Sequence, residues 1–203
     1  MNTQTLYLVR HAESTMSGKY CGSIDAPLSK KGLEQAKKVA QVFNRIPLDS
    51  CYFSDLKRAR QTFQDFNLKK TNYLQSRELR EIDFGDWESF SYAQVASQWP
   101  KLYPQWIKSP TTVQIPSGES FPALFSRVKT FSKKLTKDTA KHIAIVAHAG
   151  SLSVLTMILL DKPLTQFWKW TPPNASISIL NRALNGKTSA FKIVRMKDCK
   201  HLE

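Results

Sequence analysis

Residues 6–14 read LYLVRHAES, an apolar run that ends abruptly at an arginine and a histidine. Short continuous apolar runs are typical of strands that are buried on both faces of a parallel sheet. Residues 142–150 repeat the pattern as HIAIVAHAG. Both stretches end in a histidine followed by small residues. The pair therefore predicts two parallel strands that deliver His11 and His148 to the same edge of one sheet.

Strand-like and helix-like segments alternate along the rest of the chain. Further strands are expected at 50–54, 72–75, 78–84, 175–180 and 189–195, and helices at 29–46, 57–66, 90–99, 119–136 and 151–160. One apolar stripe in the first helix is predicted to contain Leu33, Ala36, Ala40, Phe43 and Ile46. The alternation predicts an α/β three-layer sandwich with a mostly parallel central sheet flanked by helices. Ligands bind beyond the carboxyl ends of the strands in such sheets.

Length and composition favour one domain over residues 1–203, since the 203 residues are 41% apolar and contain no linker-like run or repeat. The N-terminus does not resemble a secretory signal, and no apolar stretch is long enough to span a membrane. Three widely spaced cysteines predict neither a zinc site nor a disulfide framework, and Cys51 is expected to be buried in a strand. We therefore expect a cytoplasmic protein without a metal or cofactor.

The net charge of +14 would attract nucleic acid, anionic membranes or phosphorylated small molecules. It could equally reflect a solvated, lysine-rich surface. No aromatic RNA-binding signature or zinc-finger spacing accompanies the charge. The expected partner is therefore a small phosphate ester, with no nucleic-acid or membrane partner.

Positively charged and titratable side chains follow the predicted strands. Arg10 and His11 follow the first strand, Arg58 lies shortly after the second, and His148 follows the strand at 142–147. Arginine matches the geometry of phosphate with its planar fork of donors. The helix that begins near Gly150 would point its N-terminal N–H groups toward the same anion. Converging arginines and histidines predict a phosphate pocket that needs no metal.

Five motifs resemble those of the histidine phosphatase superfamily, in the order in which the family has them. They are LYLVRHAES (6–14), GSIDAPLSKKGLEQA (22–36), YFSDLKRARQT (52–62), LREIDFGDWE (79–88) and IVAHAG (145–150). The resemblance extends along nearly the whole chain and implies a phosphoglycerate mutase-like fold. It also implies phosphoryl transfer through a phosphohistidine.

The resemblance implies a role for each motif residue. His11 would be the nucleophile, and Arg10, Arg58 and His148 would bind the phosphoryl oxygens. Glu81 would protonate the leaving oxygen. Ser17 falls where some relatives carry an asparagine that contacts phosphate, and the small Ala149 would let substrate approach the backbone. Ala12 and Ala149 stand where the family commonly has glycine, and Ser89 stands where a WEG sequence is usual.

Chain length and short sequence segments distinguish the subgroups of the family. Mutases usually have longer chains, whereas broad-specificity phosphatases fit the length. LREIDFGDWE, PSGESF…RV (116–128) and PNASISIL (173–180) resemble α-ribazole-5′-phosphate phosphatases, which act in cobalamin nucleotide-loop assembly. That activity is the favoured prediction. A phosphate-binding pseudoenzyme is the non-enzymatic alternative, and nucleic-acid binding is a more distant one.

Residues 88–118 are expected to form a cap on the substrate side, with an irregular part at 101–118. Aromatic rings there, at Trp99, Tyr103 and Trp106, could stack on a flat benzimidazole ring. They could equally pack against the core.

Overall fold

The computed structural model describes residues 3–68, 71–184 and 190–203. Its centre is a six-stranded sheet with the strand order β3-β2-β4-β1-β5-β6. The strands are β1 (Thr3–Arg10), β2 (Ser50–Phe53), β3 (Asn72–Gln75), β4 (His142–Ala147), β5 (Ile177–Ala183) and β6 (Lys192–Asp198). β1, β4, β2 and β3 run parallel, whereas β5 and β6 pair antiparallel on the other edge of β1.

The two strands with terminal histidines are direct neighbours. β1 and β4 pair in parallel, with Val9 opposite Val146 and Arg10 opposite Ala147. The next residue of each strand is therefore a histidine at the same edge of the sheet. The predicted juxtaposition of these two strand ends is confirmed.

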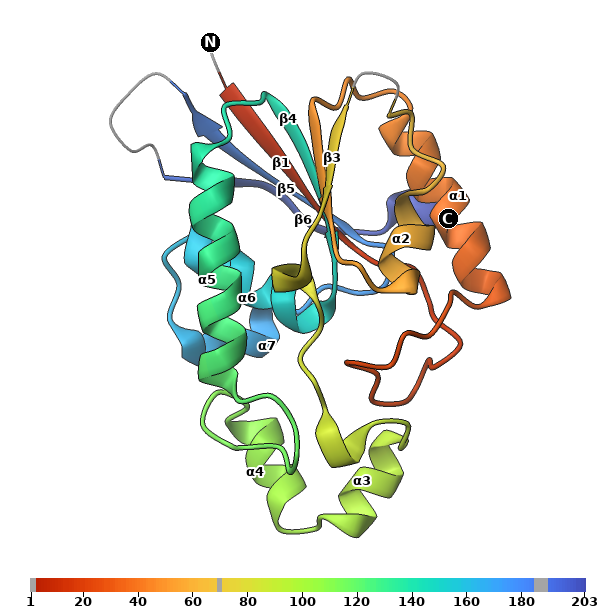
Figure 1. Ribbon diagram of the computed structural model, residues 1–203, viewed down its shortest axis with the longest axis vertical. Coiled ribbons are helices and arrows are strands. Elements are labelled where there is room, and N and C mark those ends of the chain that lie inside the picture. Colours follow the sequence, from red (N-terminus) through yellow and green to blue (C-terminus); the bar gives the residue numbers. More distant parts are fainter. Residues whose placement is uncertain (1–2, 69–70, 185–189) are drawn as a thin grey trace.

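Helices cover both faces of the sheet, as Figure 1 shows. Two lie on one face, namely α1 (Lys30–Phe43) and α2 (Lys57–Phe63), and three lie on the other, namely α5 (Phe121–Lys137), α6 (Ala149–Leu159) and α7 (Phe167–Trp170). Two short helices, α3 (Tyr92–Gln98) and α4 (Leu102–Lys108), form the end of the molecule beyond the carboxyl ends of the parallel strands (Figure 1). The expected three-layer α/β sandwich with a mostly parallel sheet is confirmed.

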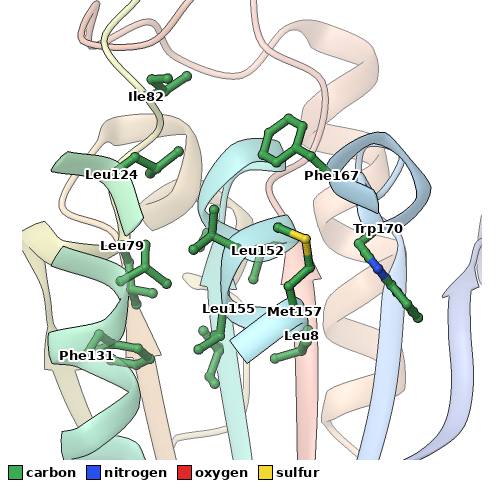
Figure 2. Close-up of a cluster of buried hydrophobic side chains, with 14 of the residues drawn as sticks. Leu8, Leu79, Ile82, Leu124, Phe131, Leu152, Leu155, Met157, Phe167 and Trp170 are labelled. Carbon is green, nitrogen blue, oxygen red and sulfur yellow. The ribbon is translucent and has the colours of Figure 1, made fainter. Parts of the chain in front are cut away.

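Each face of the sheet has its own hydrophobic core. On one face, Val9, Cys51 and Val146 pack against Ala36 and Phe43 of α1. On the other, Leu8 packs with side chains of α5 and α6, among them Phe131 and Leu155 (Figure 2). Cys51 is fully buried, as predicted. Burial on both faces explains why β1 and β4 are continuous apolar runs.

Two expectations about local structure are wrong. Residues 78–84 do not form a strand: a 3-10 helix spans Arg77–Leu79, and three backbone carbonyls of residues 78–81 accept hydrogen bonds from the side chain of Arg127 instead of from a neighbouring strand. The segment 101–118 is not wholly irregular, because it contains α4. Pro104 lies in the first turn of α4, where a missing N–H breaks no intrahelical bond.

Leu33 is also misplaced in the predicted stripe, since it is exposed. The buried face of α1 instead passes through Gly32, Ala36, Ala40 and Phe43. A Cβ at Gly32 would lie 1.9 Å from the backbone oxygen of Glu13, so only glycine allows this close approach. Ser29 caps the helix by accepting from the Gly32 N–H at 3.0 Å, as predicted.

No helix in residues 3–68, 71–184 and 190–203 combines the length and apolar character that a membrane span requires.

Candidate active site

A cavity of about 450 Å³ opens at the carboxyl ends of β1 and β4. Its polar end includes residues that the sequence singles out, namely Arg10, His11, Ser17, Arg58, Glu81 and Ala149. Its other end is aromatic, with Tyr20, Phe84, Tyr92, Tyr103, Trp106 and Trp168. The structure thus brings together, around one cavity, side chains from segments that are far apart in the chain.

His11 is held in a single protonation pattern. Its Nδ1 lies 2.7 Å from the backbone oxygen of Ala12. A carbonyl can only accept a hydrogen bond, so Nδ1 carries the proton and Nε2 carries the free electron pair. Burial, followed by the positive charges of Arg58 and Arg10, lowers the pKa of His11 well below its usual value. The imidazole is therefore neutral and its Nε2 is available as a nucleophile.

Arg58 is almost completely buried, and carbonyl oxygens hold its guanidinium. Nη1 donates to the backbone oxygen of Ile24 at 2.7 Å, and Nη2 donates to those of Gly22 at 2.9 Å and Cys21 at 3.2 Å. These three acceptors belong to one loop, residues 21–24. The loop therefore fixes the orientation of a cation that borders the cavity.

His148 lies behind this cation and against His11. Its Nδ1 accepts from Nε of Arg58 at 3.2 Å, so its Nε2 carries the proton and donates to Oγ of Ser54 at 2.8 Å. The two imidazole rings are 5.0 Å apart between centroids. Burial, and then the charge of Arg58, lowers the pKa of His148 well below its usual value. Among the described residues, Ala149 lines the cavity but His148 does not.

Arg10 has an unused donor. Its Nη1 donates to the backbone oxygen of Pro172 at 2.8 Å, whereas its buried Nε has no hydrogen-bond partner among the described residues. A buried donor without a partner costs about 1–3 kcal/mol. Burial lowers the pKa of Arg10, while the nearby carboxylate of Glu81 opposes that shift. An anion in the cavity would compensate this positive charge.

The carboxylate of Glu81 lies at the N-terminus of α6. Its Oε1 accepts from the backbone N–H of Gly150 at 2.9 Å and from that of Ile82 at 3.0 Å. The sequence predicts that this helix N-terminus faces the anion site. In the structure, the group that the Gly150 N–H contacts is the carboxylate of Glu81. The predicted proton donor and the two histidines thus meet at the end of β4.

The aromatic end of the cavity differs from its prediction. Tyr103 and Trp106 line it as expected, although Trp106 is largely buried. Trp99 does not line it, because its ring packs against those of Trp87 and Phe90, at centroid distances of 6.2 and 5.9 Å. Trp168 lines the cavity and was missed by the sequence analysis. No pattern in the sequence marks it.

Trp168 also connects α7 to the capping segment. Its Nε1 donates to the backbone oxygen of Ile107 in α4 at 2.7 Å, and its ring meets that of Trp106 edge-on, with centroids 5.1 Å apart. Tyr92, at the start of α3, is half exposed beside the same opening. Asn174 was missed as well, and its Nδ2 donates to the backbone oxygen of His11 at 3.0 Å.

Within residues 3–68, 71–184 and 190–203, no cluster of three or more histidine, cysteine, aspartate or glutamate side chains is arranged to hold a metal ion.

Comparison with known proteins identifies related phosphatases. The chain is 33% identical to Phosphoserine phosphatase 1 of Hydrogenobacter thermophilus, over 87% of this chain and 85% of the relative. It is also 33% identical to the Adenosylcobalamin/alpha-ribazole phosphatase of Salmonella typhimurium, over 80% of this chain and 83% of the relative.

Solved structures have the same fold. The crystal structure of a putative alpha-ribazole-5′-P phosphatase from Escherichia coli superposes with a TM-score of 0.83 at 26% identity, covering 96% of this chain and 97% of the other. Residues 6–196 match the family described as Histidine phosphatase superfamily (branch 1). The chain belongs to the histidine phosphatase superfamily and is a phosphatase.

Proposed function

We propose that this phosphatase hydrolyses small phosphate monoesters through a covalent intermediate on Nε2 of His11. The observation that carries the proposal is the state of His11: Nδ1 donates to the Ala12 carbonyl, and Nε2 has no hydrogen-bond partner among the described residues and lies beside two arginines at the cavity. A neutral imidazole with a fixed proton is an activated nucleophile. The paired arginine charges attract the phosphate that it attacks.

In the first step, Nε2 of His11 attacks phosphorus, and a P–N bond forms as the ester P–O bond breaks. The leaving oxygen takes a proton from the carboxyl of Glu81. Arg10 and Arg58 bind the phosphoryl oxygens and stabilise their charge in the transition state. Ser17 and the backbone at Ala149 complete the phosphate contacts in this proposal.

In the second step, water attacks phosphorus and the P–N bond breaks. Glu81, now ionised, takes a proton from the water, and inorganic phosphate leaves. His148 supports both steps from behind, because it orients Nε of Arg58 and packs against the ring of His11. The sequence resemblance assigns His148 a direct contact with phosphate, and that contact stays a prediction.

The favoured substrate is α-ribazole 5′-phosphate. Its flat benzimidazole suits the aromatic end of the cavity, where Tyr92 and Trp168 keep exposed ring surface. Relatives named for this activity support the choice. We propose that the chain forms one domain and that residues 88–118, which contribute Tyr92, Tyr103 and Trp106 to the cavity, act as a cap over this substrate.

Phosphoserine is the second candidate, because one relative at 33% identity is named for it. Phosphoserine carries an ammonium and a carboxylate but no ring that could stack on the aromatic side chains, and Lys19 is the described lining residue, besides the two arginines, that offers its carboxylate a cation. A broad-specificity phosphatase and a mutase are the remaining alternatives.

One experiment tests the reaction and the substrate together. Phosphate release is measured with α-ribazole 5′-phosphate, phosphoserine, 3-phosphoglycerate and sugar phosphates, with His11→Ala as the control. We expect the highest kcat/KM for α-ribazole 5′-phosphate and no release by the variant. Rapid quenching with labelled substrate should trap acid-labile phosphate on His11. A higher kcat/KM for phosphoserine would make phosphoserine the substrate in place of α-ribazole 5′-phosphate. The absence of trapped label would reject the covalent mechanism.

A further inference from the structure

The motif PSGESF…RV contributes no side chain to the cavity described above. Of its two charged residues, Glu119 lies just before the N-cap of α5 and Arg127 lies within the helix. They form a bidentate ion pair: Nε of Arg127 is 2.7 Å from Oε1 of Glu119, and Nη2 is 2.8 Å from Oε2. Both side chains are largely buried, with 21% and 17% of their surface exposed.

The remaining donors of Arg127 all point to the segment that carries Glu81. Nη1 donates to the backbone oxygens of Arg80 at 2.7 Å and Glu78 at 2.9 Å. Nη2 donates to the backbone oxygen of Glu81 itself at 2.9 Å. A guanidinium has five N–H donors, and all five of Arg127 are used.

Glu119 holds the other side of the same segment. Its backbone N–H donates to the backbone oxygen of Asp83 at 2.9 Å. The chain from Glu78 to Asp83 is therefore bonded to Arg127 and Glu119 on both sides of Glu81. This segment forms no ladder with any strand in the described part of the chain, and the ion pair supplies most of the hydrogen bonds to its carbonyls, with Oγ of Ser151 donating to that of Leu79 at 3.0 Å.

We propose that Arg127, oriented by Glu119, is a positioning residue for the carboxyl of Glu81. The inference rests on the proposed role of Glu81 as proton donor. Arg127 fixes the backbone from which the carboxyl extends to the Gly150 N–H and the cavity. Lysine cannot replace it, because a single ammonium cannot serve three carbonyls and a carboxylate in this fork geometry.

The role makes a prediction that a purely structural role does not. An ester with a good leaving group, such as p-nitrophenyl phosphate, breaks without a proton donor, whereas an alkyl phosphate needs one. Because kcat/KM reports the phosphorylation step, its loss should depend on the leaving group. General structural damage would lower both values alike.

The test compares Arg127→Met, Arg127→Lys and Glu119→Gln with Glu81→Gln on both esters. We expect Arg127→Met to lower kcat/KM for the alkyl ester by about 10–100-fold and for p-nitrophenyl phosphate by less than about 3-fold. Combining Arg127→Met with Glu81→Gln should add little further loss, because both changes disable the same proton transfer. Arg127→Lys and Glu119→Gln remove fewer hydrogen bonds and serve as substitutes if Arg127→Met does not fold. We expect them, too, to lower kcat/KM more for the alkyl ester than for p-nitrophenyl phosphate.

Lys134→Met is the matched control. Lys134 lies on the same helix and pairs with the carboxylate of Glu78, but it is exposed and contacts no backbone oxygen of the segment. We expect this variant to leave kcat/KM unchanged for both esters.

The outcomes separate the two proposals. Equal losses on both esters, or full additivity with Glu81→Gln, overturn the positioning role and leave the proposed function intact. If Glu81→Gln itself shows no dependence on the leaving group, the assignment of the proton donor fails and the inference fails with it.

Discussion

The carboxylate of Glu81 and the backbone N–H of Gly150 are in direct contact, with 2.9 Å between Oε1 and N. A Cβ at position 150 would lie 2.5 Å from that oxygen. Gly150→Ala must therefore push the carboxylate away from its place at the start of α6. We expect kcat/KM for an alkyl phosphate to fall about 10–100-fold, as for a misplaced general acid.

The control for this change is the same substitution in a Glu81→Ala background, where no carboxylate remains to be displaced. In that background, Gly150→Ala should lower kcat/KM for the alkyl phosphate little further. An equal further loss in that background would show that the methyl group damages the site by another route.

Glu88 joins two loops of the site. Its Oε1 accepts from the backbone N–H groups of Gly22 and Ser23, each at 2.8 Å, and of Phe84 at 3.2 Å. The first two residues belong to the loop that orients Arg58. Removing this charged acceptor in Glu88→Ala should lower the free energy of unfolding by about 3 kcal/mol. For a chain of this size, Tm should then fall by about 6–12 °C.

Glu88→Gln keeps one acceptor oxygen, so calorimetry should show less than half of that drop. Matching losses for Ala and Gln would contradict the account of Oε1 as the acceptor that joins the loops.

Two buried neutral histidines make stability depend on pH. Burial and nearby arginines lower the pKa of His11 and His148 well below 6.5, so the unfolded chain takes up protons that the native chain does not. The free energy of unfolding should therefore be intact above about pH 6.5 and fall as the pH drops below it. Each histidine contributes at most about 1.4 kcal/mol per pH unit.

Denaturant titrations between pH 7.5 and 5 measure this slope. In His148→Gln, the free energy of unfolding should change with pH less steeply, by about 1.4 kcal/mol per pH unit. His201, whose pKa is also lowered by burial, should account for part of the remaining dependence. A slope that stays the same in the variant would mean that His148 is not the titrating group.

Trp168 offers the clearest test of substrate choice. It lines the cavity and keeps 41% of its surface exposed, whereas Trp106 is mostly buried among other rings. Stacking on an aromatic ring contributes about 0.5–1.5 kcal/mol. Trp168→Ala should therefore raise KM for α-ribazole 5′-phosphate by up to about 10-fold and leave KM for phosphoserine nearly unchanged.

Trp99→Ala is the control, because Trp99 packs on Trp87 and Phe90 away from the cavity. It should lower Tm but keep the ratio of the two KM values. A change of that ratio in Trp99→Ala alone would place the aromatic contact elsewhere.

Ser89 stands where the family pattern has glycine, and its backbone has φ of +70°. This left-handed conformation costs a residue with a side chain about 1 kcal/mol. Ser89→Gly removes that cost and loses part of the gain to the greater freedom of the unfolded chain. We expect a net stabilisation of about 0.5 kcal/mol in chemical denaturation. A loss of stability would show that the serine side chain contributes more than its backbone strain costs.

The sequence by itself determined the sheet and the residues that meet at its edge. β1 and β4 are continuous apolar runs because both of their faces are buried, and each run ends at a histidine. That local pattern, together with the order of the five motifs, was sufficient to predict the layers, the sheet edge that both histidines share and the superfamily. The cap helix α4 was missed because its pattern is short and contains a proline.

Tertiary structure alone decided how the side chains are arranged around that edge. His148 lies behind Arg58, Glu81 is held by Gly150 and by the Arg127–Glu119 pair, and Trp168 closes the aromatic end. These contacts join segments far apart in the chain, and each depends on the packing of a helix against the sheet. Sequence periodicity reports which face of an element is buried, but it does not report which distant residue that face meets.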